Sequence, residues 1–262
     1  MLLTKICYSI VASYRTVVVS AMLLLSFVPE SAMGIEFPVI DASKLFDDPL
    51  LGRLMNQIQR GDEDAVRAAL KAGVSPNVKG NDGAAPIFFA LWPRSTSVLK
   101  ILLEAGADPM SRRGKNAAPL NYAVRRSDLA FAKLLLDYKA DPNSPGENGR
   151  VPLVDAMDFE TPGMIELLAA SGADINAVQG FDSMFLTAVA RQNWAAATSL
   201  INLGADVHWK RKTGHTGLDF ICKSMPRFTD EAINQPRFRP LVAALTKRGI
   251  ALPCPDQAKR WQ

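Results

Sequence analysis

The sequence predicts an all-α solenoid in which about five to six helix pairs stack along one axis. The first observation is a glycine that ends a short Leu/Ala-rich segment and returns at a nearly constant interval. The second is a helix-start signature that follows each such closing position by 13 residues. One helix pair cannot bury its apolar face alone, so a period of this length is typical of stacked units. The closing positions are Gly73, Gly106, Lys139, Gly172 and Gly204, spaced by 33, 33, 33 and 32 residues.

The first residues have the layout of a secretory signal peptide. Lys5 and Arg15 make this segment basic, and no acidic residue occurs before the end of the apolar run at 17–28. Small residues suited to signal peptidase cleavage follow at 32–34. The apolar run is shorter than the roughly 20 residues that cross a bilayer. We therefore expect residues 1–34 to be cleaved on export, with an uncleaved inner-membrane anchor as the alternative.

The rest of the chain divides into a linker at 35–47, a repeat domain at 48–255 and a tail at 256–262. The segment 48–60 begins with Asp-Pro and is rich in Gln, Asn and Arg, which predicts the first helix of an N-terminal cap with a polar outer face. At the other end, Gly249 arrives 45 residues after the previous closing glycine. The last unit is therefore predicted to be a C-terminal cap decorated by an insertion.

The unit around Gly106 shows how each repeat is expected to fold. Apolar residues recur at helical spacing within 98–105, which buries one face of a helix. Gly106 lies at the helix end, where a left-handed conformation is needed. Pro119 begins the next helix at its first turn, where its missing N–H costs nothing. Between the second helix of one unit and the first helix of the next, we expect hairpin-like fingers at 78–83, 111–116, 144–149, 178–182 and 209–214.

Three positions depart from this pattern. Lys139 stands where the other units have glycine, which predicts a strained or altered turn at the start of the third finger. Phe185 and Gly217 stand where earlier units have proline. We expect the helices that begin there to start more loosely, because proline pre-sets the backbone for the first helical turn.

Two motifs recur with this spacing. Gly-Ala-Asp-Pro at 106–109 is matched by Gly-Ala-Asp-Ile-Asn at 172–176, and Ala-Pro-Leu at 118–120 by Val-Pro-Leu at 151–153. They resemble the Gly-Ala-Asp-x-Asn turn and the Thr-Pro-Leu helix start of the ankyrin repeat, over roughly residues 48–255. The resemblance implies an ankyrin-repeat solenoid that binds a protein partner through the concave face made by its fingers and first helices.

The sequence offers no constellation of residues for catalysis, and we expect no enzyme. No Gly-x-Ser-x-Gly motif is present, and the glycines follow the repeat instead of forming a phosphate loop. His208 and His215 are the only histidines and lack further ligands for a metal site, so we expect no metal or cofactor. The carboxylates that follow the closing positions are predicted to be turn residues, namely Asp108, Asp141, Asp174 and Asp206.

The candidate binding surface is a set of basic and aromatic side chains on the fingers, with Tyr122 on a first helix. A solenoid aligns its fingers along one edge, so these side chains are predicted to form a stripe that attracts an acidic protein. Aromatic and Arg residues often dominate protein–protein binding. Nucleic acid is not expected, because the aromatics do not alternate regularly with the basic residues. The candidates are Arg112, Arg113, Lys115, Tyr122, Arg150, Phe181, Trp209, Lys210, Arg211 and Lys212.

Two cysteines remain once the predicted signal peptide, with Cys7, is removed. Cys222 lies in the last repeat and Cys254 near the C-terminus. In an oxidising compartment the pair is expected to form a disulfide that ties the cap to the last repeat, with two free thiols as the alternative.

An export signal combined with ankyrin-like repeats narrows the function. The chain resembles exported ankyrin proteins of Gram-negative bacteria, which are of two broad kinds. Some are immunity proteins that neutralise effectors delivered into the periplasm by type VI secretion, and others are partners of periplasmic catalases. We expect a periplasmic binding module of the immunity kind, whose concave face covers an effector's active-site mouth. An envelope stress or structural role, such as an accessory protein for a periplasmic catalase, is the alternative.

Overall fold

The computed structural model describes residues 46–91, 95–113, 118–146, 149–224, 236 and 238–251. All of these residues belong to one compact unit, Asp41–Gln262. The predicted signal peptide and tail, together with Lys115 and Cys254, lie outside the described residues.

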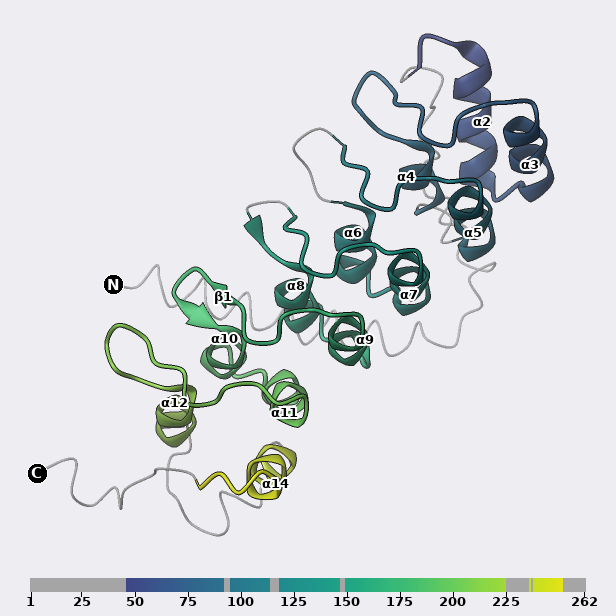
Figure 1. Cartoon of the computed structure of the whole chain (residues 1–262). Helices are drawn as coiled ribbons and strands as arrows, with labels where there is room; N and C mark the ends of the chain where they lie inside the picture. Colours follow the sequence, from purple (N-terminus) through teal and green to yellow (C-terminus); the bar gives the residue numbers. More distant parts are fainter. Residues whose placement is uncertain are drawn as a thin grey trace, which may run out of the picture. The chain divides into compact units, whose positions relative to one another are not determined.

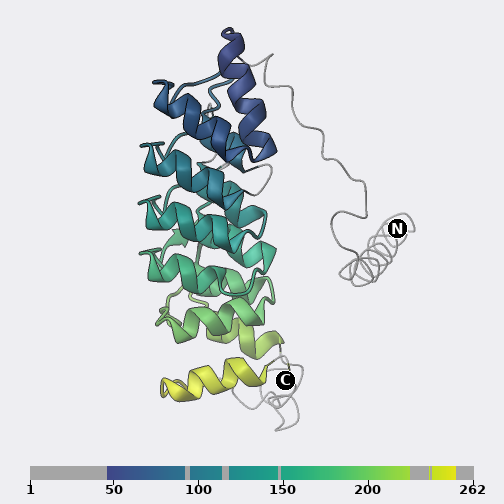
Figure 2. The same ribbon diagram turned by 90° about the vertical axis from the view of Figure 1, so that its right-hand side faces the viewer.

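The described residues form twelve helices, which associate as six pairs stacked one on the next (Figures 1 and 2). The first helices of the pairs are α2 (Pro49–Arg60), α4 (Pro86–Ala90), α6 (Pro119–Arg125), α8 (Pro152–Phe159), α10 (Met184–Ala190) and α12 (Gly217–Ser224). The second helices are α3 (Glu63–Lys71), α5 (Thr96–Glu104), α7 (Leu129–Asp137), α9 (Met164–Ala170), α11 (Trp194–Asn202) and α14 (Arg239–Lys247). The predicted solenoid of about five to six helix pairs is confirmed. The fingers leave the stack beside the first helices (Figure 1).

Apolar side chains from both helix layers fill the space between neighbouring pairs. Leu102 on α5, Phe131 on α7 and Leu168 on α9 are fully buried. They belong to one cluster of buried apolar residues to which all six pairs contribute. Stability therefore arises mainly from packing between adjacent pairs, as expected for a solenoid.

Side-chain caps fix the starts of several helices. Asp62, Asp128 and Asn193 each accept a hydrogen bond from the backbone N–H three residues further on, at the beginning of α3, α7 and α11. Asp48 caps α2 by accepting from the N–H of Leu50 at 2.8 Å. Such caps satisfy backbone donors that the helix itself leaves free. The predicted N-terminal helix at 48–60 is confirmed.

The aspartates that follow the closing positions have the predicted structural role. In each, the carboxylate accepts a hydrogen bond from the backbone N–H two residues further on, at 2.8 or 2.9 Å. This bond holds the turn that leads into the finger. The four residues are Asp108, Asp141, Asp174 and Asp206.

Asparagines join consecutive turns to one another. Asn77 donates to the carbonyl oxygen of Gly106 at 2.8 Å and accepts from the N–H of Asp108 at 2.7 Å. Asn143 makes the same two bonds to the turn that follows it. Met110 holds the equivalent position between them, and its sulfur accepts from the next turn's backbone N–H at 3.1 Å. A thioether cannot donate, so one of the two bonds is missing there.

Met110→Asn is expected to raise the free energy of unfolding by about 0.5–1.5 kcal/mol, because an amide restores the donor and is a better acceptor than sulfur. Urea denaturation followed by circular dichroism measures the change. Asn143→Met is the matched reverse substitution and is expected to lower stability. Equal denaturation midpoints for both variants and the parent chain would show that these bonds contribute no net stability.

Lys139 has the left-handed backbone that its neighbours in the repeat reach with glycine. Its φ is +71°, whereas Gly106 and Gly172 have φ values of +89° and +96°. A side chain carrying a Cβ is strained in this region. The predicted strain at the start of the third finger is confirmed.

Lys139→Gly is expected to stabilise the domain by about 1 kcal/mol, since the left-handed conformation costs a residue with a Cβ roughly 1–2 kcal/mol and glycine loses part of that gain through its freedom in the unfolded chain. The thermal midpoint reports the effect. Gly172→Lys is the matched control and should lower the midpoint. A Lys139→Gly variant that melts below the parent chain would contradict the interpretation.

The segment between Gly172 and the next helix start, which holds the fourth finger, is one residue shorter than in the other units, because α10 begins at Met184. Its strands β1 (Val178–Gln179) and β2 (Asp182–Ser183) pair antiparallel across a two-residue turn. Because of this turn, Ser183 caps α10 and Met184 holds the position of the earlier prolines. The assignment of Phe185 to that position is therefore wrong. The short finger also explains why the last interval is 32 residues instead of 33.

Phe185 instead holds the position of Leu120 and Leu153, and it is fully buried. Its ring packs against Gly217, the first residue of α12 in the next unit. A Cβ atom on Gly217 would lie 2.5 Å from Cε1 and 2.7 Å from Cδ1 of Phe185. The glycine at 217 makes room for this close contact, and the expectation of a loosened helix start there stays a prediction.

The last helix closes the stack. α14 packs against α11, and Phe238 beside it is buried with its ring centroid 4.9 Å from that of Trp194. Arg248 donates to the carbonyl oxygens of Ile201 and Ala205 at 3.2 and 2.8 Å. These contacts cover the end of the apolar core, which is the task predicted for the C-terminal cap.

Cys222 on α12 is buried and takes part in a disulfide. Its partner lies outside the described residues. The pairing of Cys222 with Cys254 therefore stays a prediction.

Candidate protein-binding surface

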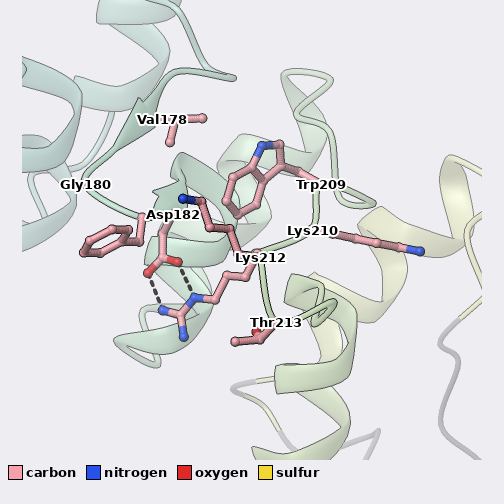
Figure 3. A pocket seen from close by; sticks show the side chains of 9 residues that line it. Val178, Gly180, Asp182, Trp209, Lys210, Lys212 and Thr213 are labelled. Atoms are coloured by element: carbon pink, nitrogen blue, oxygen red, sulfur yellow. Dashed lines mark hydrogen bonds and ion pairs between the residues drawn. The ribbon is translucent and has the colours of Figure 1, made fainter.

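The fourth and fifth fingers enclose a pocket of about 520 Å³ (Figure 3). Its wall from the fourth finger consists of Val178, Gly180, Phe181 and Asp182, and its wall from the fifth finger is the segment 209–213. We call it the finger pocket. The fold thus brings together half of the residues that the sequence suggested for partner binding, namely Phe181, Trp209, Lys210, Arg211 and Lys212.

Phe181 is presented at the tip of its hairpin. Gly180 before it has a φ of +68°, which glycine adopts without steric cost and which suits the first position of a two-residue type II′ turn. This turn leaves Phe181 82% exposed, and Val178 on β1 is 53% exposed. Two large apolar side chains exposed on one finger are a feature that marks contact surfaces.

Arg211 joins the two walls of the pocket. Its Nε and Nη2 donate to the two carboxylate oxygens of Asp182 as a bidentate ion pair (Figure 3). The hydrogen bonding by Asp182 raises the pKa of Arg211 above its ordinary value. The guanidinium carbon also lies 5.3 Å from the ring centroid of Phe220 on α12. Arg211 is therefore a side chain that holds the fifth finger to the fourth.

The two lysines of the fifth finger are exposed and point in different directions. Figure 3 shows Lys212 extending toward the fourth finger, whereas Lys210 points away from the pocket. The half-buried Trp209 carries its indole ring between the two fingers. Since Asp182 and Arg211 balance each other's charge, Lys212 gives the mouth of the pocket a positive charge.

Two other predicted arginines also bind within the domain. Arg112 donates to Ser144 Oγ at 2.7 Å and to the carbonyl oxygen of Pro145 at 3.0 Å. Arg113 forms an ion pair with Asp82. Both arginines join a finger to its neighbour, so they have a role in the scaffold. Their contact with a partner stays a prediction.

Arg150 belongs to a charged network on the first helices that the sequence analysis missed. Its Nε lies 2.9 Å from Oδ1 of Asp155, and it also pairs with Asp158, which Arg191 binds from the next unit. Burial raises the pKa of Asp155, and the attraction of Arg150 offsets only part of that rise. Burial opposes the charge of Arg150, yet its hydrogen bond to Asp158 leaves its pKa raised. Asp158 and Arg191 carry opposite charges one repeat apart, and this spacing is the sequence signal that could have revealed the network.

Tyr122 lies away from the finger pocket. It is half-buried on α6, and its ring meets that of Phe88 on α4 edge-on, with centroids 5.9 Å apart. This geometry is favourable for aromatic pairs. Tyr122 therefore packs between two helix pairs, and its contact with a partner stays a prediction.

Among the described residues, no three His, Cys, Asp or Glu side chains gather where a metal ion would be held. No helix in the described part of the chain combines the length and the apolar character that crossing a membrane requires.

Comparisons with known proteins agree with the repeat pattern. Residues 96–179 match the family model of ankyrin repeats in three copies. The transient receptor potential cation channel subfamily A member 1 of Drosophila melanogaster is 37% identical over 82 residues, which is 31% of this chain and 7% of the channel. The chain therefore spans only a small part of that relative. The ankyrin repeat domain of Bcl-3, a member of the IkappaB protein family, has a similar structure, with a TM-score of 0.60 at 23% identity over 76% of this chain and 86% of that one.

The stacked helix pairs, the fingers and these matches define a helical ankyrin-repeat domain. Ankyrin repeats imply a protein–protein interaction module, and such domains are typically non-catalytic, because stacked units offer an extended surface for binding. The finger pocket lies on this surface and exposes the apolar side chains of Val178 and Phe181.

Proposed function

We propose that this chain acts in the periplasm as an immunity protein, which blocks a secreted effector that attacks the cell envelope. The finger pocket carries the binding part of the proposal, because it exposes apolar side chains on a scaffold built for protein contact. The signal-peptide layout of residues 1–34 motivates the location. That segment lies outside the described residues.

The proposed mechanism is steric. The fingers and first helices cover the mouth of the effector's active site, so no chemistry by the immunity protein is needed. The scaffold is preorganised by bonds between neighbouring turns, which lowers the entropy lost on binding. Exposed lysines such as Lys212 speed encounter with an acidic effector surface.

A competition experiment tests the proposal. A strain that lacks this gene is expected to be outgrown by its parent strain only while the parent's type VI secretion system is intact. Complementation with the full chain should restore growth, and complementation with a chain lacking residues 1–34 should not, because the protein would stay in the cytoplasm. Equal growth in both settings, together with new sensitivity to peroxide, would contradict immunity and support the catalase-partner alternative.

A further inference from the structure

We infer that the finger pocket binds one bulky apolar side chain of the partner protein, presented on an extended acidic segment. This inference deepens the proposed function and rests on it, because it names the chemistry that the partner must present. It is carried by three properties of the pocket: apolar walls, walls held in place before binding, and an unbalanced positive charge.

The walls leave apolar surface in water. Phe181 and Val178 are 82% and 53% exposed, and Trp209 is half-buried on the opposite wall. An apolar side chain placed between the two fingers would contact all three. Burial of such surface is the main driving force of protein association. A cleft of about 520 Å³ has room for such a side chain and part of the segment that carries it.

The walls are held in position before a partner arrives. Arg211 binds Asp182 through two hydrogen bonds, which fixes the distance between the fingers. The fifth finger is closed by backbone bonds from Arg211 to His215 at 3.0 Å and from Gly214 to Arg211 at 2.8 Å. Preorganised contacts lose less entropy on binding. Binding is therefore expected to require little rearrangement of this part of the surface.

The positive charge of the pocket favours acidic residues on either side of the bound apolar side chain. Asp182 is the only acidic side chain in the lining, and Arg211 already neutralises it. Lys210 and Lys212 remain exposed, with Lys212 directed toward the fourth finger. A carboxylate beside the apolar side chain would meet the ammonium group of Lys212, whereas Lys210 points away from the pocket and attracts the segment only over a longer distance. Both charges disfavour a basic segment.

A protein segment fits these features better than a membrane surface does. Two lysines are fewer than the four to eight basic residues that typically hold a protein on anionic lipid. A pocket with fixed walls also favours a defined side chain over fluid acyl chains. We therefore infer a protein ligand, and binding to anionic vesicles is the competing outcome in the test.

The test uses the mature chain and capped five-residue peptides with a central phenylalanine between pairs of acidic residues. The indole N–H resonance of Trp209 in a ¹H–¹⁵N spectrum, assigned by its loss in Trp209→Phe, reports occupation of the pocket. Replacing the peptide's phenylalanine by alanine is expected to weaken binding about fivefold or more, and replacing its acidic residues by lysine should weaken it as much. Added salt should weaken binding of the acidic peptide.

Matched variants of the chain separate the pocket from the rest of the surface. Phe181→Ser is expected to weaken the acidic phenylalanine peptide about fivefold or more, and Lys212→Ala about twofold to fivefold with a smaller salt dependence. Phe159→Ser changes a phenylalanine that is 45% exposed on α8, outside the pocket, and should leave binding unchanged. Lys71→Ala on α3 is the corresponding control for Lys212→Ala. Circular dichroism checks that helicity is retained.

Equal affinity for the phenylalanine and alanine peptides would overturn the inference. So would tighter binding of the lysine peptide, or binding to anionic phosphatidylglycerol vesicles that Phe181→Ser abolishes while no peptide binds. The proposed function is tested by a separate experiment. A deletion strain that is not outgrown by its parent in the competition contradicts immunity, whatever the result of peptide binding. If the chain still protects its strain but binds all the peptides with equal affinity, only the inference about the finger pocket is contradicted.

Discussion

Gly217→Ala is expected to lower the free energy of unfolding by about 1–3 kcal/mol, and Gly217→Pro by at least as much. The added Cβ would lie 2.5 Å from a ring carbon of Phe185, which is fully buried. The φ of Gly217 is not in the left-handed region, so the cost comes from the contact and not from the backbone. Urea denaturation at fixed protein concentration measures it.

A double-mutant cycle identifies the cause. Phe185→Leu together with Gly217→Pro installs the residue types of earlier pairs such as α6 and α8. The double variant is expected to be more stable than the sum of the two single effects predicts, by about 0.5–3 kcal/mol. Additive effects would show that Phe185 does not constrain Gly217.

Leu102→Ala and Leu168→Ala are each expected to destabilise the domain by about 2–5 kcal/mol, because each leaves a cavity between helix pairs. Both side chains are fully buried, Leu102 on α5 and Leu168 on α9. The denaturation midpoint should fall while the native far-UV spectrum stays helical.

Leu50→Ala is the matched control for these core substitutions. Leu50 lies on α2 and is 64% exposed, so its truncation should change stability by less than about 0.5 kcal/mol. A loss of stability as large as that of Leu102→Ala would mean that the buried cluster is not the source of stability.

The fold could be predicted from the sequence because its period is set by local chemistry. A residue able to turn left-handed at the closing position and a helix-start signature 12 or 13 residues later recur along the array, and each is recognisable without tertiary information. Lys139 shows how strongly the closing position favours the left-handed conformation, since even a lysine adopts that backbone conformation there. The position of Met184 could not be predicted in the same way, because the spacing of two closing glycines does not locate a one-residue deletion between them.

The candidate site was predictable only in part. The alignment of fingers places Phe181 and Trp209 on adjacent units, and the structure brings them to one pocket. The role of Arg211 was not predictable from its type, since a solvated arginine and a paired one look alike in a basic segment. Arg211 lies 29 residues after Asp182, which is less than one repeat, so a search for opposite charges one repeat apart would also have missed this pair.

The contact between Phe185 and Gly217 limits how this array can change its length. Units that meet through leucine and proline present matching surfaces, so copies could be gained or lost there during evolution without a steric clash. At the junction of α10 with α12, a unit that begins with any residue other than glycine would clash with Phe185. We therefore expect the last two helix pairs to be inherited as one block. The finger pocket lies between the fingers of that block, so the array can grow or shrink toward its N-terminal end while the pocket is passed on intact.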